Sequence, residues 1–490
     1  MPNEPASTAV AMLVVALLLA TAVLSSRATG RLGIPVALIF IGLGMAAGHE
    51  GAGGIAFEDY GLTFRLGVVA LSLILFDGGL NTTSADIRRV LKPAGLLATL
   101  GVLLSTIFMS GAARLLGFSW GESLLIGAVV SSTDAAAVFG VLRGSGLSLK
   151  KRVATTLEVE SGLNDPLAVI LTVIATASLA SGKPPSLMAL ALVPVQIAIG
   201  AGAGLVLALG ARHVLTKIGM PGGLYAVLTV SLAFLAFAAP TLISGSGFLS
   251  VYVAGAVLGN GPLPYRSGLL RVHDALAWFA QILMFLLLGL LVSPLRLLEV
   301  AGAGTLLGLI LAILVRPLSA LPCLLPFRYP WRESLFVAWA GLRGAVPIIL
   351  ATYPVLAGVA GAPRVFDTAF FIVVLSTLVP GATIRSLVRL VRLQSDAAPP
   401  PPALLEITST QLLAGEIMSF YIDAASSVAG ARVVDIPFPL DAAAMLVVRG
   451  RELIAPRGYT IIEHGDHVHV FCRPEDRAFV TLLFGAREQD

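Results

Sequence analysis

The sequence predicts an α-helical polytopic membrane protein with thirteen transmembrane helices in two inverted six-helix repeats, followed by a small cytoplasmic α+β domain. Three observations support this fold class. Of the 490 residues, 57% are hydrophobic and 12% are charged, against about 25% charged residues in ordinary soluble domains. Apolar stretches long enough to cross a bilayer core about 30 Å thick recur up to residue 390. Beyond residue 392 the composition becomes that of a soluble domain.

Thirteen apolar stretches make up the membrane part, separated by short clusters of Arg, Lys, Gly and Pro. The first stretch has neither a basic leading segment nor a small-residue cleavage site, so we expect a retained helix and not a signal peptide. In chain order the expected spans cover residues 9–26, 33–48, 62–80, 93–116, 121–143, 153–180, 187–211, 221–238, 242–260, 272–293, 300–322, 332–355 and 366–388.

The basic residues between the spans predict the orientation of the chain. Cytoplasmic loops of membrane proteins carry an excess of Lys and Arg. If the N-terminus lies outside, the basic loop residues that remain outside are only Arg65, Arg114, Lys183, Arg296 and Arg364. An even number of spans would scramble this alternation, so we expect thirteen spans and a cytoplasmic C-terminus.

Polar residues and glycines interrupt two of the spans. Residues 131–134 place four small polar side chains in the fifth span, and residues 341–347 place two glycines around Arg343 in the twelfth. Broken helices at membrane depth occur where the backbone lines a binding cavity. Six helices, a linker helix and six more put both breaks at the fifth position of a half, as in inverted-repeat transporters.

Two carboxylates lie within the apolar spans, Asp134 in the fifth and Asp165 in the sixth. A charge at the centre of a bilayer costs ~2.5 to 3.5 kcal/mol even on the lenient insertion scale. Membrane proteins retain such a group where it moves or relays a charge. We therefore expect this protein to handle cations or protons.

The sixth span predicts a cation site around Asp165. Glu160 and Asn164 are four residues apart, and so are Ser161 and Asp165, so two polar pairs lie on adjacent stripes of one helix. Asp165 lies about 18 Å along the helix from its cytoplasmic start, near the midplane. Pro166 lacks an amide and frees a backbone carbonyl one turn earlier. A carboxylate, a hydroxyl and a free carbonyl suit a dehydrated monovalent cation.

An arginine buried in the membrane needs a counter-charge, because a guanidinium does not lose its proton in a protein. We expect Glu160 to form this ion pair with Arg343. The pair would leave Asp165 as the net titratable negative charge, with Asp134 helping to coordinate the ion. One carboxylate that takes either a cation or a proton exchanges the two by competition.

The chain after the last span divides into a linker and a soluble domain. We assign residues 1–392 to the membrane domain, residues 393–402 to a linker that four consecutive prolines stiffen, and residues 403–490 to the cytoplasmic domain. Residues 1–402 carry 25 Lys plus Arg against 16 Asp plus Glu, a net +9, and residues 403–490 carry 7 against 12, a net −5. The basic part suits anionic lipid and the acidic part suits the cytoplasm.

Within the tail we expect short strands at residues 431–437, 444–448 and 467–472 and a closing helix at 475–484. Alternating histidines beside a turn are usually surface residues, so we do not expect His464, His467 and His469 to bind a metal. The two cysteines, far apart in sequence, imply neither a disulfide framework nor a metal cluster. We expect no cofactor.

Several motifs resemble one known family. The segments SSTDAAAVFG, ESGLNDP, GSGFLSVYVAGAVLGN and GLRGAVP resemble the NhaP-type branch of bacterial cation/proton antiporters, and the resemblance covers nearly all of residues 5–390. Residues 448–466 resemble the C-terminal half of RCK (TrkA-C) regulatory domains, without a preceding nucleotide-binding half. The combination is similar to the subgroup regarded as potassium/proton antiporters.

The resemblance implies exchange of K⁺, with Na⁺ as the alternative, for H⁺ across a bacterial inner membrane, and a homodimer. With Glu160 and Arg343 paired and one exchange carboxylate, we expect this exchange to be electroneutral. We expect the acidic, tethered tail to regulate exchange through its dimerisation and a small ligand of unknown identity. Asn164 and Asp165 match the pair that carries exchange in the family. Glu160 and Arg343 match its buried ion pair. The other positions that match its ion site are Thr133, Asp134 and Ser161.

Other readings of single residues stay open. Glu160 could be a direct ion ligand instead of an ion-pair partner. Asp77 could belong to the ion site, to a funnel or to helix packing, while Glu158, close to the end of its helix, is expected in solvent.

The rival functions lack their sequence signals. A potassium channel would carry a TVGYG-like filter, an intramembrane aspartyl protease a Gly-x-Gly-Asp motif, and an anion or solute transporter fewer acids at the breaks. We therefore expect a secondary transporter and not an enzyme, with the lipid bilayer and a second copy as partners and no nucleic acid. Side chains alone do not decide between K⁺ and Na⁺.

Overall fold

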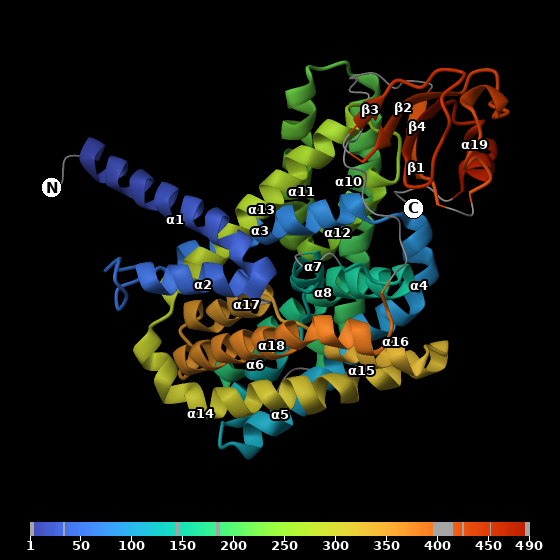
Figure 1. Cartoon of the computed structure of the whole chain (residues 1–490). Helices are drawn as coiled ribbons and strands as arrows, with labels where there is room; N and C mark the ends of the chain where they lie inside the picture. The colour runs from blue at the N-terminus through green and yellow to red at the C-terminus, as the bar shows by residue number, and fades with distance from the viewer. Residues whose placement is uncertain are drawn as a thin grey trace. The chain divides into compact units, whose positions relative to one another are not determined.

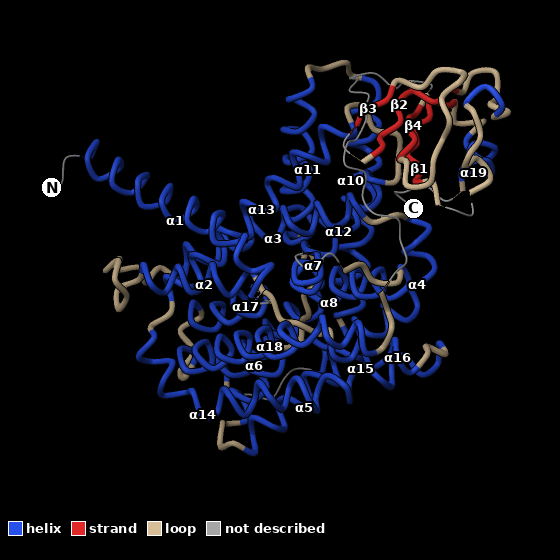
Figure 2. Tube along the Cα trace, in the orientation of Figure 1, coloured by secondary structure: helices blue, strands red, loops and turns tan. Residues whose placement is uncertain are grey.

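The structure is a computed structural model that describes residues 4–32, 35–143, 147–182, 187–394, 415–423, 426–450 and 452–485. The chain divides into two compact units. The first comprises Met1–His213, Ala226–Gly261 and Leu270–Ser395, and the second comprises Val214–Tyr225, Pro262–Leu269 and Asp396–Asp490. Figure 1 traces the chain from end to end, and Figure 2 distinguishes its helices from the one sheet.

The described part of the chain before the tail forms α-helices joined by loops and short non-helical breaks (Figure 1). Its α-helices are α1 (Glu4–Leu32), α2 (Val36–Ala47), α3 (Tyr60–Asn81), α4 (Ser84–Leu96), α5 (Val102–Leu115), α6 (Trp120–Val129), α7 (Ala135–Arg143), α8 (Lys151–Ser181), α9 (Leu187–Ala191), α10 (Val193–Lys217), α11 (Gly222–Leu242), α12 (Gly247–Gly259), α13 (Arg266–Leu291), α14 (Pro294–Ile310), α15 (Arg316–Leu324), α16 (Trp331–Trp339), α17 (Ala345–Leu356) and α18 (Ala362–Leu390).

Among the described residues, nine helical segments are long and apolar enough to cross a membrane. Four shorter apolar helices, α2, α6, α12 and α17, occupy further predicted spans. The structure therefore has the helical membrane architecture that the composition predicted. The total of thirteen spans stays a prediction.

Both predicted breaks are present. The fifth span consists of α6 and α7, and residues 130–134 between them are not helical. The twelfth consists of α16 and α17, with non-helical residues 340–344 between them. The span before each break also carries a π-helical turn, Leu97–Gly101 before the first and Leu311–Val315 before the second. The two halves thus share the same sequence of features, in keeping with the repeat, which stays a prediction.

The tail contains a four-stranded antiparallel sheet in the order β1-β4-β2-β3 (Figure 2). Its elements are β1 (Glu416–Tyr421), β2 (Ala443–Arg449), β3 (Glu452–Ile454), β4 (His467–Cys472) and helix α19 (Arg477–Phe484). One face of the sheet and α19 share a core that includes Phe420, Val447, Val470 and Phe484.

The predicted tail strands at 444–448 and 467–472 correspond to β2 and β4. The strand predicted at 431–437 is wrong, because this segment contains a 3₁₀ turn, Val433–Asp435, and a single bridge from Arg432 to Ile461. Pro437 and Pro439 lack the amides that a continuous strand needs. His467 and His469 are buried rather than at the surface. No group of three or more His, Cys, Asp or Glu that could hold a metal occurs in the described ranges.

Candidate functional site

The two helix breaks lie against each other. The Asp134 amide donates to the carbonyl of Leu342 at 2.8 Å, and Nε of Arg343 donates to the carbonyl of Val130 at 2.7 Å. A Cβ on Gly344 would come within 2.1 Å of an Asp134 carboxylate oxygen. Gly344 therefore allows the close approach of the two breaks, and each break satisfies backbone groups that the other leaves unpaired.

Helix α8 packs its polar stripe against the first break. The Asn164 side-chain amide donates to the hydroxyl of Thr133 at 2.6 Å, and the Ser161 hydroxyl donates to the Thr133 carbonyl at 3.1 Å. The Ser132 hydroxyl donates to the carboxylate of Asp165. These contacts join side chains roughly thirty positions apart in sequence, and α8 brings them together because Asn164, Ser161 and Asp165 share one side of it.

Asp134 lies immediately before α7. Its carboxylate accepts the backbone N–H groups of Ala136 at 2.8 Å and Ala137 at 3.3 Å. A carboxylate at a helix N-terminus is favoured by the helix dipole. The five residues predicted to bind the ion, Thr133, Asp134, Ser161, Asn164 and Asp165, thus occupy one region around the first break.

The buried ion pair differs from the prediction. Glu160 binds Arg316, with Nη1 to Oε1 at 2.7 Å and Nη2 to Oε2 at 3.0 Å, and both side chains are at most 5% exposed. Arg343 instead donates to the carbonyls of Val130 and Gly341. The predicted pairing of Glu160 with Arg343 is therefore wrong. The planar guanidinium of Arg316 donates to both carboxylate oxygens of Glu160 at once. Because Glu160 is occupied in this way, Arg343 donates to backbone carbonyls at the breaks.

Local features of the sequence place Arg316 at this position. It follows the π-helical turn Leu311–Val315 and precedes Pro317, which lacks an amide and disturbs regular helix bonding there. A Cβ on Gly341 would lie 2.3 Å from Nε of Arg316, so the glycine makes room for the guanidinium. The signal in the sequence was a second arginine within an apolar span, of the same kind as Arg343.

Five charged side chains gather at the breaks: Asp134, Glu160, Asp165, Arg316 and Arg343. Fully ionised, three carboxylates and two guanidinium groups sum to one negative charge. Ser132 is a further residue at the site that the sequence analysis placed in the break but did not include among the ligands. Its contact with Asp165 was not visible in the sequence, because it joins two separate helices.

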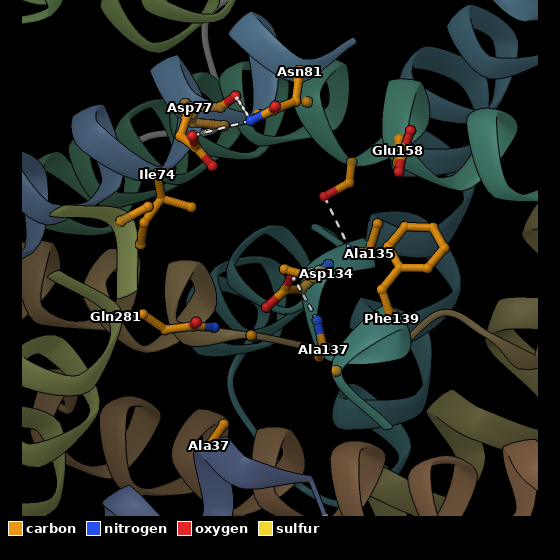
Figure 3. Close-up of a pocket in the computed structure, with 18 of the residues that line it drawn as sticks. Ala37, Ile74, Asp77, Asn81, Asp134, Ala135, Ala137, Phe139, Glu158 and Gln281 are labelled. Carbon is orange, nitrogen blue, oxygen red and sulfur yellow. Dashed lines mark hydrogen bonds between the residues drawn. The ribbon is translucent and has the colours of Figure 1, made fainter. Parts of the chain in front are cut away.

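A cavity of about 820 Å³ opens onto this region. Asp134, Ser161 and Asp165 line it together with Asp77 and Glu158. Figure 3 shows Asp77 and Glu158 on its wall, apart from Asp134. Glu158 therefore faces the cavity, and the placement of Asp77 favours the funnel reading over membership of the ion site.

Two close contacts lie along the wall of this cavity. Asn81 donates to the carbonyl and the carboxylate of Asp77 at 2.9 and 3.1 Å (Figure 3). The ring of Tyr252 lies so close to Gly162 that a Cβ there would meet it at 2.6 Å. The predicted role of a carbonyl freed by Pro166 stays a prediction.

The chain resembles known proteins over nearly its whole length. Residues 13–390 match the family described as sodium/hydrogen exchanger, transmembrane, and residues 417–485 match the TrkA-C domain. The K(+)/H(+) antiporter NhaP2 of Shewanella sp. (strain ANA-3) is 38% identical over 481 residues, covering 96% of this chain and 83% of that protein. The K(+)/H(+) antiporter NhaP of Alkalimonas amylolytica is 38% identical over 483 residues, covering 97% and 83%.

A more distant relative, the Na(+)/H(+) antiporter NhaP of Pseudomonas aeruginosa, is 32% identical over 344 residues, covering 65% of this chain and 79% of that protein. The solved structure of the sodium proton antiporter MjNhaP1 from Methanocaldococcus jannaschii at pH 8 shares the fold, with a TM-score of 0.62 and 22% identity. It covers 76% of this chain and 99% of that one. The prediction of a helical transporter fold is confirmed, and the chain belongs to the sodium/hydrogen exchanger family of transmembrane proteins.

Proposed function

We propose that the protein exchanges a monovalent cation, preferentially K⁺, for H⁺ across the cell membrane. The observation that carries this proposal is the single uncompensated negative charge among the five charged groups at the helix breaks. One monovalent cation or one proton neutralises that charge. The preference for K⁺ rests on relatives 38% identical over nearly the whole chain that are named K(+)/H(+) antiporters.

Asp165 is the exchange carboxylate in this mechanism. It is 4% exposed, lines the cavity, and has the hydroxyl of Ser132 as its partner. Glu160 is held by Arg316, so it is occupied whichever ion is bound. Further oxygens at the same break come from Thr133, Asp134, Ser161 and Asn164, and hard monovalent cations prefer oxygen ligands. A proton and a cation cannot occupy Asp165 together, and competition couples their fluxes.

The same charge count predicts one proton per cation and therefore electroneutral exchange. A membrane potential shifts an electrogenic equilibrium by about 2.3 kcal/mol per net charge per 100 mV. An equilibrium that moves with an imposed voltage would contradict the one-for-one count.

Proton flux in proteoliposomes tests the function itself. Purified protein should move protons against an imposed gradient of K⁺, and K⁺, Na⁺, Rb⁺ and Li⁺ should be compared in one preparation. We expect the cation concentration that half-saturates proton flux to be lowest for K⁺. If the half-saturating concentration is lowest for Na⁺, the protein is a sodium/proton antiporter, as one 32% identical relative is named. Cation flux without coupled protons would instead indicate a channel.

We also propose how the transporter is assembled and oriented. We propose a homodimer in the bacterial inner membrane, with the N-terminus outside and the TrkA-C-like tail in the cytoplasm. The tail is proposed to regulate exchange, through its dimerisation and a small cytoplasmic ligand. It matches the TrkA-C domain, which we interpret as a regulatory module, and an acidic domain tethered to a transport domain has little other reason to be present. No cofactor is required, because the transported ions are the substrates.

A further inference from the structure

Helix α13 contributes one amide side chain to the cavity. From residue 275 to residue 292, Gln281 is the only residue with a carboxylate, hydroxyl or amide side chain. A polar side chain inside a membrane span usually faces a protein interior or a water-filled cavity and marks a substrate pathway. Gln281 has no role in the site described above.

One face of α13 follows the cavity along its length. Arg271, Asp274, Trp278, Gln281 and Phe285 line it, at spacings of three and four residues that put them on one stripe of the helix. The stripe begins with charged side chains and ends with an apolar one. Gln281 is the last polar residue along it.

Gln281 and Asp165 line the same cavity. Figure 3 shows the Gln281 side chain extending toward the start of α7, where Asp134 lies.

The amide has no structural partner to explain it. In the part of the chain that the structure describes, Asn81 bonds Asp77 and Asn164 bonds Thr133, but no protein group hydrogen-bonds the side chain of Gln281. It is only partly buried, and its exposed part faces the cavity. No hydrogen bond therefore supports a role for Gln281 in holding helices together. Its amide oxygen is a suitable ligand for a hard cation.

We propose that the side-chain oxygen of Gln281 is a further ligand of the transported cation, contributed from the wall of the cavity that faces Asp134. This inference rests on the proposed exchange function. A neutral ligand adds no charge to the site, so the one-for-one exchange stays unchanged. Its oxygen binds the cation directly, and its contribution depends on cation size. Gln281 therefore helps to set the cation preference.

The test replaces the amide by a side chain of similar length without oxygen, Gln281→Met, in the full-length protein. We expect the half-saturating K⁺ concentration for proton flux in proteoliposomes to rise about tenfold, as for one lost polar contact. The maximal rate should stay close to that of the unaltered protein, and the ratio of the K⁺ and Na⁺ half-saturating concentrations should change. Gln281→Glu, which keeps an oxygen at that position but adds a carboxylate, should recover K⁺ affinity, and its added charge can alter the one-for-one count.

The control is Phe279→Leu, on the same helix but half exposed and not among the cavity residues. It should leave the half-saturating cation concentrations and the cation preference unchanged.

The proposal is overturned if the half-saturating concentration of every cation is the same for Gln281→Met as for the unaltered protein. It is equally overturned if affinity for all cations falls by the same factor together with the melting temperature, which is the signature of a packing role. Gln281→Leu provides the same readouts should Gln281→Met not reach the membrane. Absence of cation-driven proton flux in the unaltered protein would instead refute the exchange function itself.

Discussion

Two arginines lie buried at the helix breaks, and the structure accommodates them in different ways. Arg316 faces a carboxylate, while Arg343 faces backbone carbonyls freed by the helix breaks. A guanidinium stays charged in both settings. Arg316 and Glu160 therefore form a charge-balanced unit, and Arg343 acts as the fixed positive charge that ties one break to the other.

The first prediction concerns this unit. Removing one partner of a buried ion pair strands the other and costs about 3–5 kcal/mol. Glu160→Gln and Arg316→Met should each lower the melting temperature in detergent, and the double variant should lose less than the sum of the two. A double-mutant cycle should show a larger coupling of Glu160 with Arg316 than with Arg343. Stronger coupling to Arg343 would contradict the observed pairing.

At the level of elements, the sequence predicted the positions of features that depend on local chemistry. The polar run at 131–134 and the glycines around Arg343 marked both breaks, and Asn164–Asp165 marked the polar stripe of α8. The choice between Arg316 and Arg343 as partner of Glu160 depends on how three helices are rotated against each other. No local pattern encodes that rotation, so composition and spacing could not decide it.

The tail shows the same limit. β2 and β4 carry apolar runs between turn signals, and the sequence identified both. The short strand β3 and the strand β1 were missed. Strand β3 covers only Glu452–Ile454 and is defined by its pairing with β2, not by a pattern of its own.

The end of α18 and the start of α8 are joined in a way that can be tested. The Lys150 amide donates to the carbonyl of Leu393 at 3.1 Å, beside a bridge between Leu149 and Gln394. Leu393 and Leu149 belong to one buried cluster. The last described residues before the tail are thus anchored to the segment that leads into the helix of Asp165.

The second prediction concerns this anchor. Lys150 has φ −52° and ψ 131°, which proline adopts without strain, so Lys150→Pro removes the amide while keeping the backbone. The loss of one hydrogen bond of about 1 kcal/mol should speed amide hydrogen exchange in residues 388–394 roughly fivefold. Lys150→Ala, which keeps the amide, should exchange like the unaltered protein. Equal exchange in all three proteins would show that this bond does not hold the end of α18.

The molecule as a whole joins a transporter of the sodium/hydrogen exchanger family to a TrkA-C domain. Two sites are coupled only as far as a ligand binds the alternative conformations with different affinity. A tail that regulates transport must therefore favour one conformation of the membrane domain over another.

The third prediction tests that coupling. A chain truncated after Gln394 should still exchange ions, but with a displaced pH profile or a displaced half-saturating K⁺ concentration. Proton flux is measured for the full and the truncated chain, with and without small cytosolic metabolites. Identical rates, affinities and pH profiles under all conditions would show that the tail serves assembly and not regulation.

The central claim is that one carboxylate, Asp165, takes the cation and the proton in turn. The most direct measurement is K⁺-driven proton flux in proteoliposomes for Asp165→Asn, alongside Asp59→Asn as control. Asp59 caps α3 through the amide of Leu62, and asparagine caps a helix as well as aspartate does. We expect no exchange above background from a folded Asp165→Asn protein and full exchange from the control. Retention of more than a few per cent of the normal flux by Asp165→Asn would contradict the mechanism.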